Sequence, residues 1–494
     1  MLSKRHILSV ILLLFVTLTT AADDGIRLRS CRRGTPRPHS VNLRRSGSEG
    51  RTPGGSFYHG ERHQLTVLVA FNDRSFIGDE ASTLEQWNKI FNVENLTEAP
   101  FKGSVHDYFM AQSYDDFNVI FDLLYVQVSG DAKKYASTNE DDENSQYLVQ
   151  DIMDVLKTLD IEWNRYDWNG DGYVNQLLIV YAGQGMNNYD KKQYTDLIWP
   201  HQWWMSEHLK DRQEGVYCEP IPVTVGSETY LVDCYCALAE LTRNNDYGSF
   251  GTICHEYSHC FGFPDFYYDQ TSYVYGWDLM DRGNYNGDGY QPPCYSAHER
   301  WLMGWLTPIE LKEATTITDM PALEDEGRAY LIRNDGYENE YYFVENRQMT
   351  GWDASLPGSG IMVFHIDYDP SVWAGTTVTT NSSRRQRYIL FHANNSSYDY
   401  KEWAYPHGST NALTNTSTPA ATLFHTNTDG TKLMNKSLTE MSVTGGLASF
   451  NFSATSTGVQ HVDAELQQAT VLYRFGMVDI VRDAKGEIRK VIRK

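Results

Sequence analysis

Residues 252–265, Thr-Ile-Cys-His-Glu-Tyr-Ser-His-Cys-Phe-Gly-Phe-Pro-Asp, constrain this chain more strongly than any other stretch. They contain two histidines, His255 and His259, four residues apart, with Glu256 directly after the first. Side chains at this spacing lie on one face of a helix, one turn apart, so both imidazoles can reach a single ion. Glu256 can then reach a water molecule bound to that ion. The alternative is an amphipathic core helix in which the histidine pair is accidental.

The residues after this helix supply a third ligand. Gly262 allows the chain to leave in a left-handed conformation, and Pro264 stops the helix from continuing. The turn can then return the carboxylate of Asp265 to the two histidines. Two imidazoles, one carboxylate and one water are the ligands of a catalytic zinc site, because a structural zinc site would fill the fourth position with protein. The stretch therefore predicts zinc bound by His255, His259 and Asp265.

Further segments carry a family resemblance. The pattern HExxHxxGxxD is similar to the metzincin signature, and Tyr275-Gly-Trp-Asp-Leu-Met280 is similar to the Met-turn that lies under the metal in those enzymes. Five flanking segments extend the match, so that the chain resembles the immune-inhibitor-A-like M6 metalloproteases from about residue 60 to 370. These segments are residues 105–114, 197–203, 295–305, 345–348 and 356–360. One departure from some metzincins is Arg282, where a tyrosine would stand two places after Met280.

The resemblance implies roles for individual residues. His255, His259 and Asp265 would be the zinc ligands, Glu256 the catalytic acid and base, and Met280 the methionine of the turn. It implies a zincin-like α+β or α/β catalytic domain that hydrolyses peptide bonds, with proteins and peptides as substrates. Because Arg282 replaces the tyrosine, no tyrosine ligand or oxyanion donor is assigned there.

Composition limits the class of protein. A length of 494 residues predicts two or three domains, and 33 tyrosines and 12 tryptophans favour a folded chain over a disordered one. The formal net charge of −22 argues against nucleic acid as a partner. The same charge is consistent with solubility or with calcium binding.

The first 62 residues suggest export. Residues 1–22 have a basic start, an apolar run and small residues for cleavage, which predicts a signal peptide; the alternative is an uncleaved anchor. We expect a secreted or cell-surface protein with no membrane span after cleavage. Residues 23–62 are basic and rich in Gly, Pro and Ser, which is typical of a flexible segment or a propeptide. Cys31 could hold such an enzyme latent by binding zinc, or could be an unpaired cysteine of the tail.

Residues 63–310 are predicted to form the catalytic domain. Buried strands are expected at 65–71 and 177–182, further strands at 117–128, and helices at 82–91, 105–113 and 145–159. Helices between such strands favour an α/β sheet behind the active-site helix.

A second metal site is predicted just before residue 177. Asp167, Asn169, Asp171, Tyr173 and Asn175 stand at positions one, three, five, seven and nine of an EF-hand-type calcium loop, with Tyr173 contributing its backbone carbonyl. Position twelve is leucine instead of glutamate, so the loop is not a complete EF-hand. The alternative is a polar turn.

The remainder of the chain favours strands. Strands at 329–333, 340–345 and 360–366 predict a β-sandwich-like domain over residues 311–456, packed on the catalytic domain. The tail, residues 457–494, has three short strand-like segments and a basic end. It is either a sorting signal read by export machinery or a terminal β-hairpin with solvated charges. Seven cysteines allow up to three disulfides with one left over.

These features together predict a secreted zinc-dependent endopeptidase. One alternative is a catalytically silent surface adhesin on the same scaffold, and another is a zinc hydrolase of non-peptide amides. Hydrolysis of casein that a chelator blocks would distinguish the endopeptidase from the silent adhesin. A comparison of protein substrates with small amides would distinguish it from the hydrolase of non-peptide amides.

Overall fold

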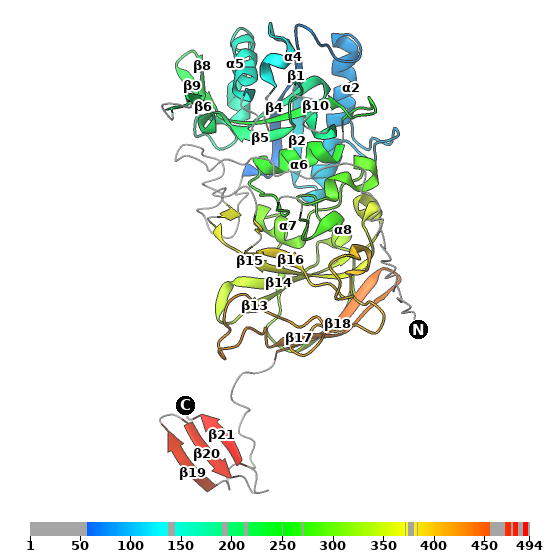
Figure 1. Cartoon of the computed structure of the whole chain (residues 1–494), viewed down its shortest axis with the longest axis vertical. Helices are drawn as coiled ribbons and strands as arrows, with labels where there is room; N and C mark the ends of the chain where they lie inside the picture. The colour runs from blue at the N-terminus through cyan, green and yellow to red at the C-terminus, as the bar shows by residue number, and fades with distance from the viewer. Residues whose placement is uncertain are drawn as a thin grey trace, which may run out of the picture.

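The computed structural model describes residues 57–136, 144–189, 196–211, 216–248, 250–268, 271–370, 372–373, 380–382 and 384–454, and the backbone of three strands within 470–492 (Figure 1). The predicted signal peptide, most of the basic segment with Cys31, and parts of the tail lie outside these residues. Within the described residues, no helix combines the length and apolar composition needed to cross a bilayer.

A five-stranded sheet forms the first half of the molecule. Its order is β2 (Phe117–Gln127), β1 (Gly60–Ala70), β4 (Leu177–Gln184), β10 (Cys234–Leu241) and β5 (His201–Trp204). The first four run parallel to one another, and β5 runs antiparallel to β10 at the edge. The last seven residues of β1 and the first seven of β4 are buried, as the apolar runs at 65–71 and 177–182 predicted.

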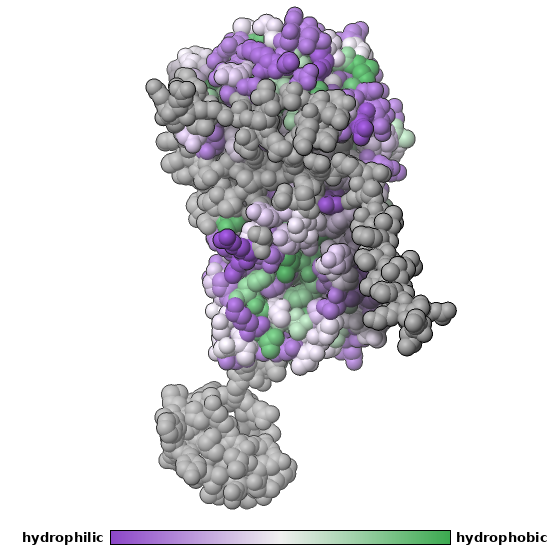
Figure 2. All heavy atoms as spheres, viewed as in Figure 1, coloured by the Kyte–Doolittle hydropathy of each residue, from purple (hydrophilic) through white to green (hydrophobic). Residues whose placement is uncertain are grey.

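Helices cover this sheet. They are α2 (Glu80–Asn92), α3 (Val105–Gln112), α4 (Ala132–Tyr135), α5 (Ser145–Leu156) and α6 (Phe250–Cys260). Asp79 and Ser104 begin α2 and α3, because their side chains accept hydrogen bonds from backbone N–H groups of the first turn. Where α2, α4 and α5 reach the surface, hydrophilic residues predominate on the face shown in Figure 2. The helices predicted at 82–91, 105–113 and 145–159 are confirmed, with ends shifted by no more than three residues.

Two small sheets complete this half. One has the order β3 (Tyr173–Val174), β9 (Glu228–Val232), β8 (Ile221–Val225), and the other pairs β6 (Leu209–Asp211) with β7 (Val216–Tyr217). Short 3₁₀ helices include η2 (Trp163–Tyr166), η5 (Tyr275–Trp277) and η6 (Gly283–Gly289).

The second half contains two sheets that share a core. The larger has the order β11 (Ile309–Glu310), β13 (Tyr330–Asn334), β14 (Tyr337–Arg347), β15 (Gly360–Asp367), β16 (Tyr388–Leu390). The smaller has the order β12 (Thr315–Met320), β18 (Leu447–Ala454), β17 (Lys436–Thr444). Two short helices, α7 (Ala297–Met303) and α8 (Leu323–Glu326), lie between the halves and contact β14 (Figure 1).

Strand β14 is buried on both faces. Tyr341 and Phe343 belong to the core shared with the first half, whereas Tyr342 and Val344 belong to the core shared with the smaller sheet. This alternation follows from the two-residue period of a strand. The larger sheet therefore packs against the first half through one face and against β12, β17 and β18 through the other. The first core continues across residue 310, where the sequence placed a domain boundary.

Two further predictions have outcomes here. The three tail strands are present as an antiparallel sheet of β19 (Thr470–Phe475), β20 (Val478–Arg482) and β21 (Ile488–Ile492). The six described cysteines are buried, and none of the disulfides that the cysteine count allowed forms among them. The sequence prediction of a mixed α/β protein with several sheets is confirmed.

Candidate metal centre

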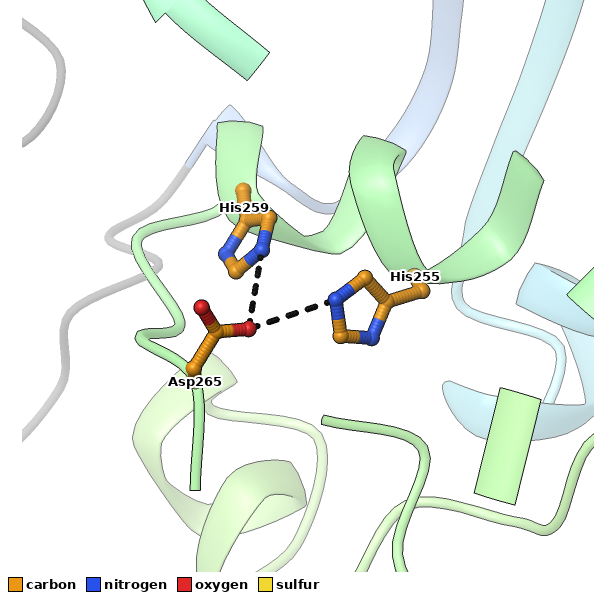
Figure 3. Close-up of side chains that lie close together, drawn as sticks. All are labelled: His255, His259 and Asp265. Carbon is orange, nitrogen blue, oxygen red and sulfur yellow. Dashed lines mark ion pairs between the residues drawn. The ribbon is translucent and has the colours of Figure 1, made fainter. Parts of the chain in front are cut away.

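Helix α6 places His255 and His259 together. Every residue of this helix is buried, and the four-residue spacing puts both imidazoles on one face, one turn apart. Their ring centroids lie 4.8 Å apart, with an angle of 82° between the ring planes. Figure 3 shows both rings directed from α6 towards the loop that follows it.

That loop returns Asp265 to the histidines. Gly262 has a φ of 103°, which a residue with a Cβ rarely adopts, and its N–H donates to the carbonyl of His259. Oδ1 of Asp265 lies 3.3 Å from Nε2 of His255 and 3.4 Å from Nε2 of His259 (Figure 3). The three candidate ligand atoms all lie within 4.8 Å of one another. The structure therefore brings together the three residues that the sequence predicted as ligands.

The outward-facing nitrogen of each ring is held by a backbone carbonyl. Nδ1 of His255 donates to the carbonyl of Leu279 at 2.9 Å, and Nδ1 of His259 donates to that of Phe263 at 2.7 Å. Because a carbonyl can only accept, the proton of each neutral ring must lie on Nδ1, which leaves the Nε2 lone pair for a metal. Metal-binding histidines in proteins commonly have such a partner on their second nitrogen.

Burial and charge act in opposite directions on the site's pKa values. Burial alone would lower the pKa of His255, but the carboxylates of Asp265 and Glu256 raise it to about 9. Burial alone would raise the pKa of Asp265, but His259 and His255 lower it. In the metal-free protein His255 and Asp265 therefore form a buried pair of opposite charges, and a metal ion that binds there has to displace a proton.

The donor atoms fit a divalent cation. Nε2 of His259 and both carboxylate oxygens of Asp265 accept or donate no hydrogen bond within the described residues. Buried polar atoms normally have a partner, and convergent ones without a partner point to a bound ion. Two imidazole nitrogens and one carboxylate oxygen are the ligand types that zinc prefers in a three-ligand site. No other group of three such residues occurs in the described part of the chain.

Glu256 and Met280 lie next to these ligands. Glu256 follows His255 on α6 and is only 3% exposed, and its charge raises the pKa of that histidine. Met280 is fully buried, and its backbone carbonyl accepts a hydrogen bond from the N–H of Phe266 at 2.9 Å. The turn at Met280 therefore contacts both the residue after Asp265 and, through Leu279, the first histidine.

Two buried aspartates that the sequence analysis missed hold this turn. Asp278 accepts from the N–H of Met280 at 2.8 Å, and burial raises its pKa to about 7. Asp281 accepts from three consecutive backbone N–H groups, those of residues 273–275, at 2.8–3.1 Å. The signal was two acidic residues inside an otherwise apolar stretch, Trp-Asp-Leu-Met-Asp, because a buried carboxylate needs several donors. Arg282 lies with its guanidinium carbon 5.0 Å from the ring centroid of Tyr275.

The predicted calcium loop has the hydrogen bonds of a tight turn. Asp167 accepts from the backbone N–H groups of Asp171 and Gly172 at 3.1 and 2.8 Å. Asp171 accepts from the N–H of Tyr173 at 2.9 Å, and Asn175 from that of residue 168 at 2.6 Å. The side chain of the fifth candidate, Asn169, donates to Asp171 at 2.8 Å. These bonds are what the turn alternative requires, so calcium at this loop stays a prediction.

The comparisons with known proteins match the part of the chain that contains these residues. Residues 65–304 match the model of the family "Immune inhibitor A peptidase M6, catalytic domain". "Immune inhibitor A" of Bacillus thuringiensis subsp. alesti is 26% identical over 257 residues, which cover 46% of this chain. The match spans 34% of that relative's length, or about a third. Through residues 65–304, this chain belongs to the immune inhibitor A peptidase M6 family.

Proposed function

We propose that this protein is a secreted zinc-dependent endopeptidase. The observation that carries the proposal is the convergence of the His255, His259 and Asp265 donor atoms in a fully buried site. Membership of a peptidase family supports a protein substrate and a metal. The predicted signal peptide at residues 1–22 supports secretion. The two facing sheets of the second half support a sandwich-like domain packed on a zincin-like one.

The reaction needs a base beside an activated water. When bound, zinc supplies a water of lowered pKa and a positive charge for the carbonyl oxygen of the scissile bond. Glu256 directly follows His255 on α6, and its carboxylate would take the proton of the attacking water and pass it to the leaving amine. The Leu279 and Phe263 carbonyls keep the two imidazoles in the tautomer that presents Nε2. Burial of the three ligands limits competition from bulk water.

The test couples metal content to cleavage. Purified protein should contain about one zinc per chain, hydrolyse casein, lose activity with a chelator and regain it when zinc is added. Mapping of the products should show internal cleavage sites, as an endopeptidase requires. Absence of bound zinc would overturn the proposal. Stoichiometric zinc without any peptide hydrolysis would also overturn it, and would favour the silent adhesin.

A further inference from the structure

The backbone on either side of Asp265 is held by a segment far along the chain. The N–H of Thr380 donates to the carbonyl of Asp265 at 2.9 Å. The side-chain amide of Asn381 donates to the carbonyl of Phe266, 115 residues earlier, at 2.8 Å. Both residues of this segment lie in the second half of the molecule, beyond the region that matches the family model.

Asn381 is itself fixed on both sides of its amide. Its Oδ1 accepts from the backbone N–H groups of Arg387 and Tyr388 at 2.6 and 3.0 Å, and its Nδ2 also donates to the carbonyl of Tyr388 at 2.7 Å. The residue is fully buried. Only a side chain with a donor and an acceptor at the same end can make this set of bonds, and an aspartate carboxylate has no donor. Asn381 therefore connects the start of β16 to the loop that carries Asp265.

Tyr388 makes a second connection at the same place. Its ring stacks on that of Phe266, with centroids 3.9 Å apart and 22° between the planes. Its hydroxyl donates to Oδ2 of Asp278 at 2.8 Å, while the other oxygen of that carboxylate accepts from the N–H of Met280. The β-rich half thus contacts both the third candidate ligand's loop and the turn under the site.

The carboxylate of Asp265 depends on this support. Its Oδ1 forms ion pairs with Nε2 of His255 and His259, at 3.3 and 3.4 Å, and neither oxygen accepts a hydrogen bond from any other described group. The position from which this carboxylate reaches the two histidines depends on the backbone of residues 265–266. The contacts on this backbone include those from Thr380, Asn381 and Met280.

We propose that Asn381 is a positioning residue of the metal centre, acting through Phe266 on Asp265, and that the β-rich half is consequently part of that centre. This inference rests on the proposed zinc site. Loss of such a supporting partner typically weakens metal binding by about 10–100-fold, because the ligand spends less time in the binding geometry.

The test uses Asn381→Asp and Asn381→Ala in the full chain. Asn381→Asp retains the oxygen that accepts from the N–H groups of Arg387 and Tyr388, but it cannot donate to the carbonyls of Phe266 and Tyr388. Zinc affinity is measured by competition with a chromophoric chelator, and ligand geometry by the visible spectrum of the cobalt-substituted protein. We expect both variants to bind zinc about 10–100-fold more weakly and to show an altered cobalt spectrum.

The matched control is Asn346→Ala. Asn346 is also fully buried and donates to two backbone carbonyls, those of Met320 and Gly446, at 2.9 and 2.7 Å, but within the β-rich half. The Asn346→Ala variant should be less thermally stable than the wild type in the metal-free state, while its zinc affinity stays at the wild-type level. Wild-type affinity in both Asn381 variants would overturn the inference, and so would an equal loss of affinity in Asn346→Ala. A wild-type protein that binds no zinc would instead overturn the proposed function.

Discussion

Nδ1 of His255 donates a hydrogen bond to the backbone carbonyl of Leu279, 2.9 Å away and 24 residues later in the chain. This bond joins α6 to the turn that contains Met280. It sets the tautomer of the imidazole, so that Nε2 faces Asp265. The orientation of the first candidate ligand is therefore determined by a segment outside the HExxH stretch.

Substitution of Glu256 by glutamine should separate metal binding from catalysis. The amide keeps the size of the side chain but cannot take a proton from water, so we expect peptide hydrolysis to fall by about 10²–10⁴-fold. Zinc content should stay at the wild-type level, because Glu256 is not one of the three candidate ligands. The matched control is Glu85→Gln, since the side chain of Glu85 is 74% exposed on α2. Full activity in Glu256→Gln would remove this residue from the mechanism.

Substitution of His259 by alanine should abolish zinc binding. The remaining His255 and Asp265 leave two protein ligands, one fewer than a catalytic zinc site has. Zinc measured by atomic absorption after dialysis should fall from about one ion per chain to near zero. His407→Ala, at a histidine whose side chain is 38% exposed in the β-rich half, should keep its zinc. Retention of stoichiometric zinc by His259→Ala would show that the ligand set is wrong.

Asp278 should give the metal-free protein a distinct pH dependence of stability. Burial raises its folded-state pKa to about 7, with Asp281 also raising it, while the Tyr388 hydroxyl, the Met280 N–H and Arg347 lower it. The unfolded value is about 3.9, so the folded state binds this proton more tightly. Its contribution to stability is thus present below about pH 4 and is lost as the pH rises to about 7.

In the Asp278→Asn variant the side chain at this position cannot titrate. The variant should therefore not show the loss of stability that Asp278 causes as the pH rises. The free energy of unfolding is measured by urea denaturation of both proteins with a chelator present. We expect the value of the wild type, relative to that of the variant, to decrease between about pH 4.5 and about pH 7.5, because this range spans the unfolded and folded pKa values of Asp278, about 3.9 and about 7. Asp154→Asn, at a side chain that is 77% exposed on α5, should follow the wild type. A pH-independent difference between wild type and Asp278→Asn would contradict the assignment.

The loop from Asp167 to Asn175 offers a test between calcium and a simple turn. If calcium binds there, its addition should raise the melting temperature of the wild type by binding only the folded state. Asp171→Asn keeps the oxygen that accepts from the N–H of Tyr173 but removes one charge, so this response should weaken. Asp429→Asn, in a turn of the β-rich half, is the control. A wild-type melting temperature that does not respond to calcium would contradict calcium binding and favour the simple turn.

Much of the candidate site was predictable because its geometry is local. The pitch of a helix decides that His255 and His259 share a face, and the Gly262 and Pro264 turn returns Asp265 within six residues of the second histidine. The buried strands β1 and β4 were equally readable, since an unbroken apolar, β-branched run has few other solutions. The hydrogen-bond partners of the two imidazoles could not be predicted, because a backbone carbonyl such as that of Leu279 has no signature in the sequence.

The sequence by itself determined the three candidate ligands, the adjacent Glu256, and the alternation of helices with strands around them. Only the tertiary structure decided which groups hold those ligands in place: Asp278 and Asp281 under the turn, and Asn381 on the loop of Asp265. It also decided that β14 is buried on both faces and that the six described cysteines form no disulfide. The physical reason is distance along the chain. Periodicity and turn chemistry act over a few residues, whereas these contacts exist only after remote segments have packed together.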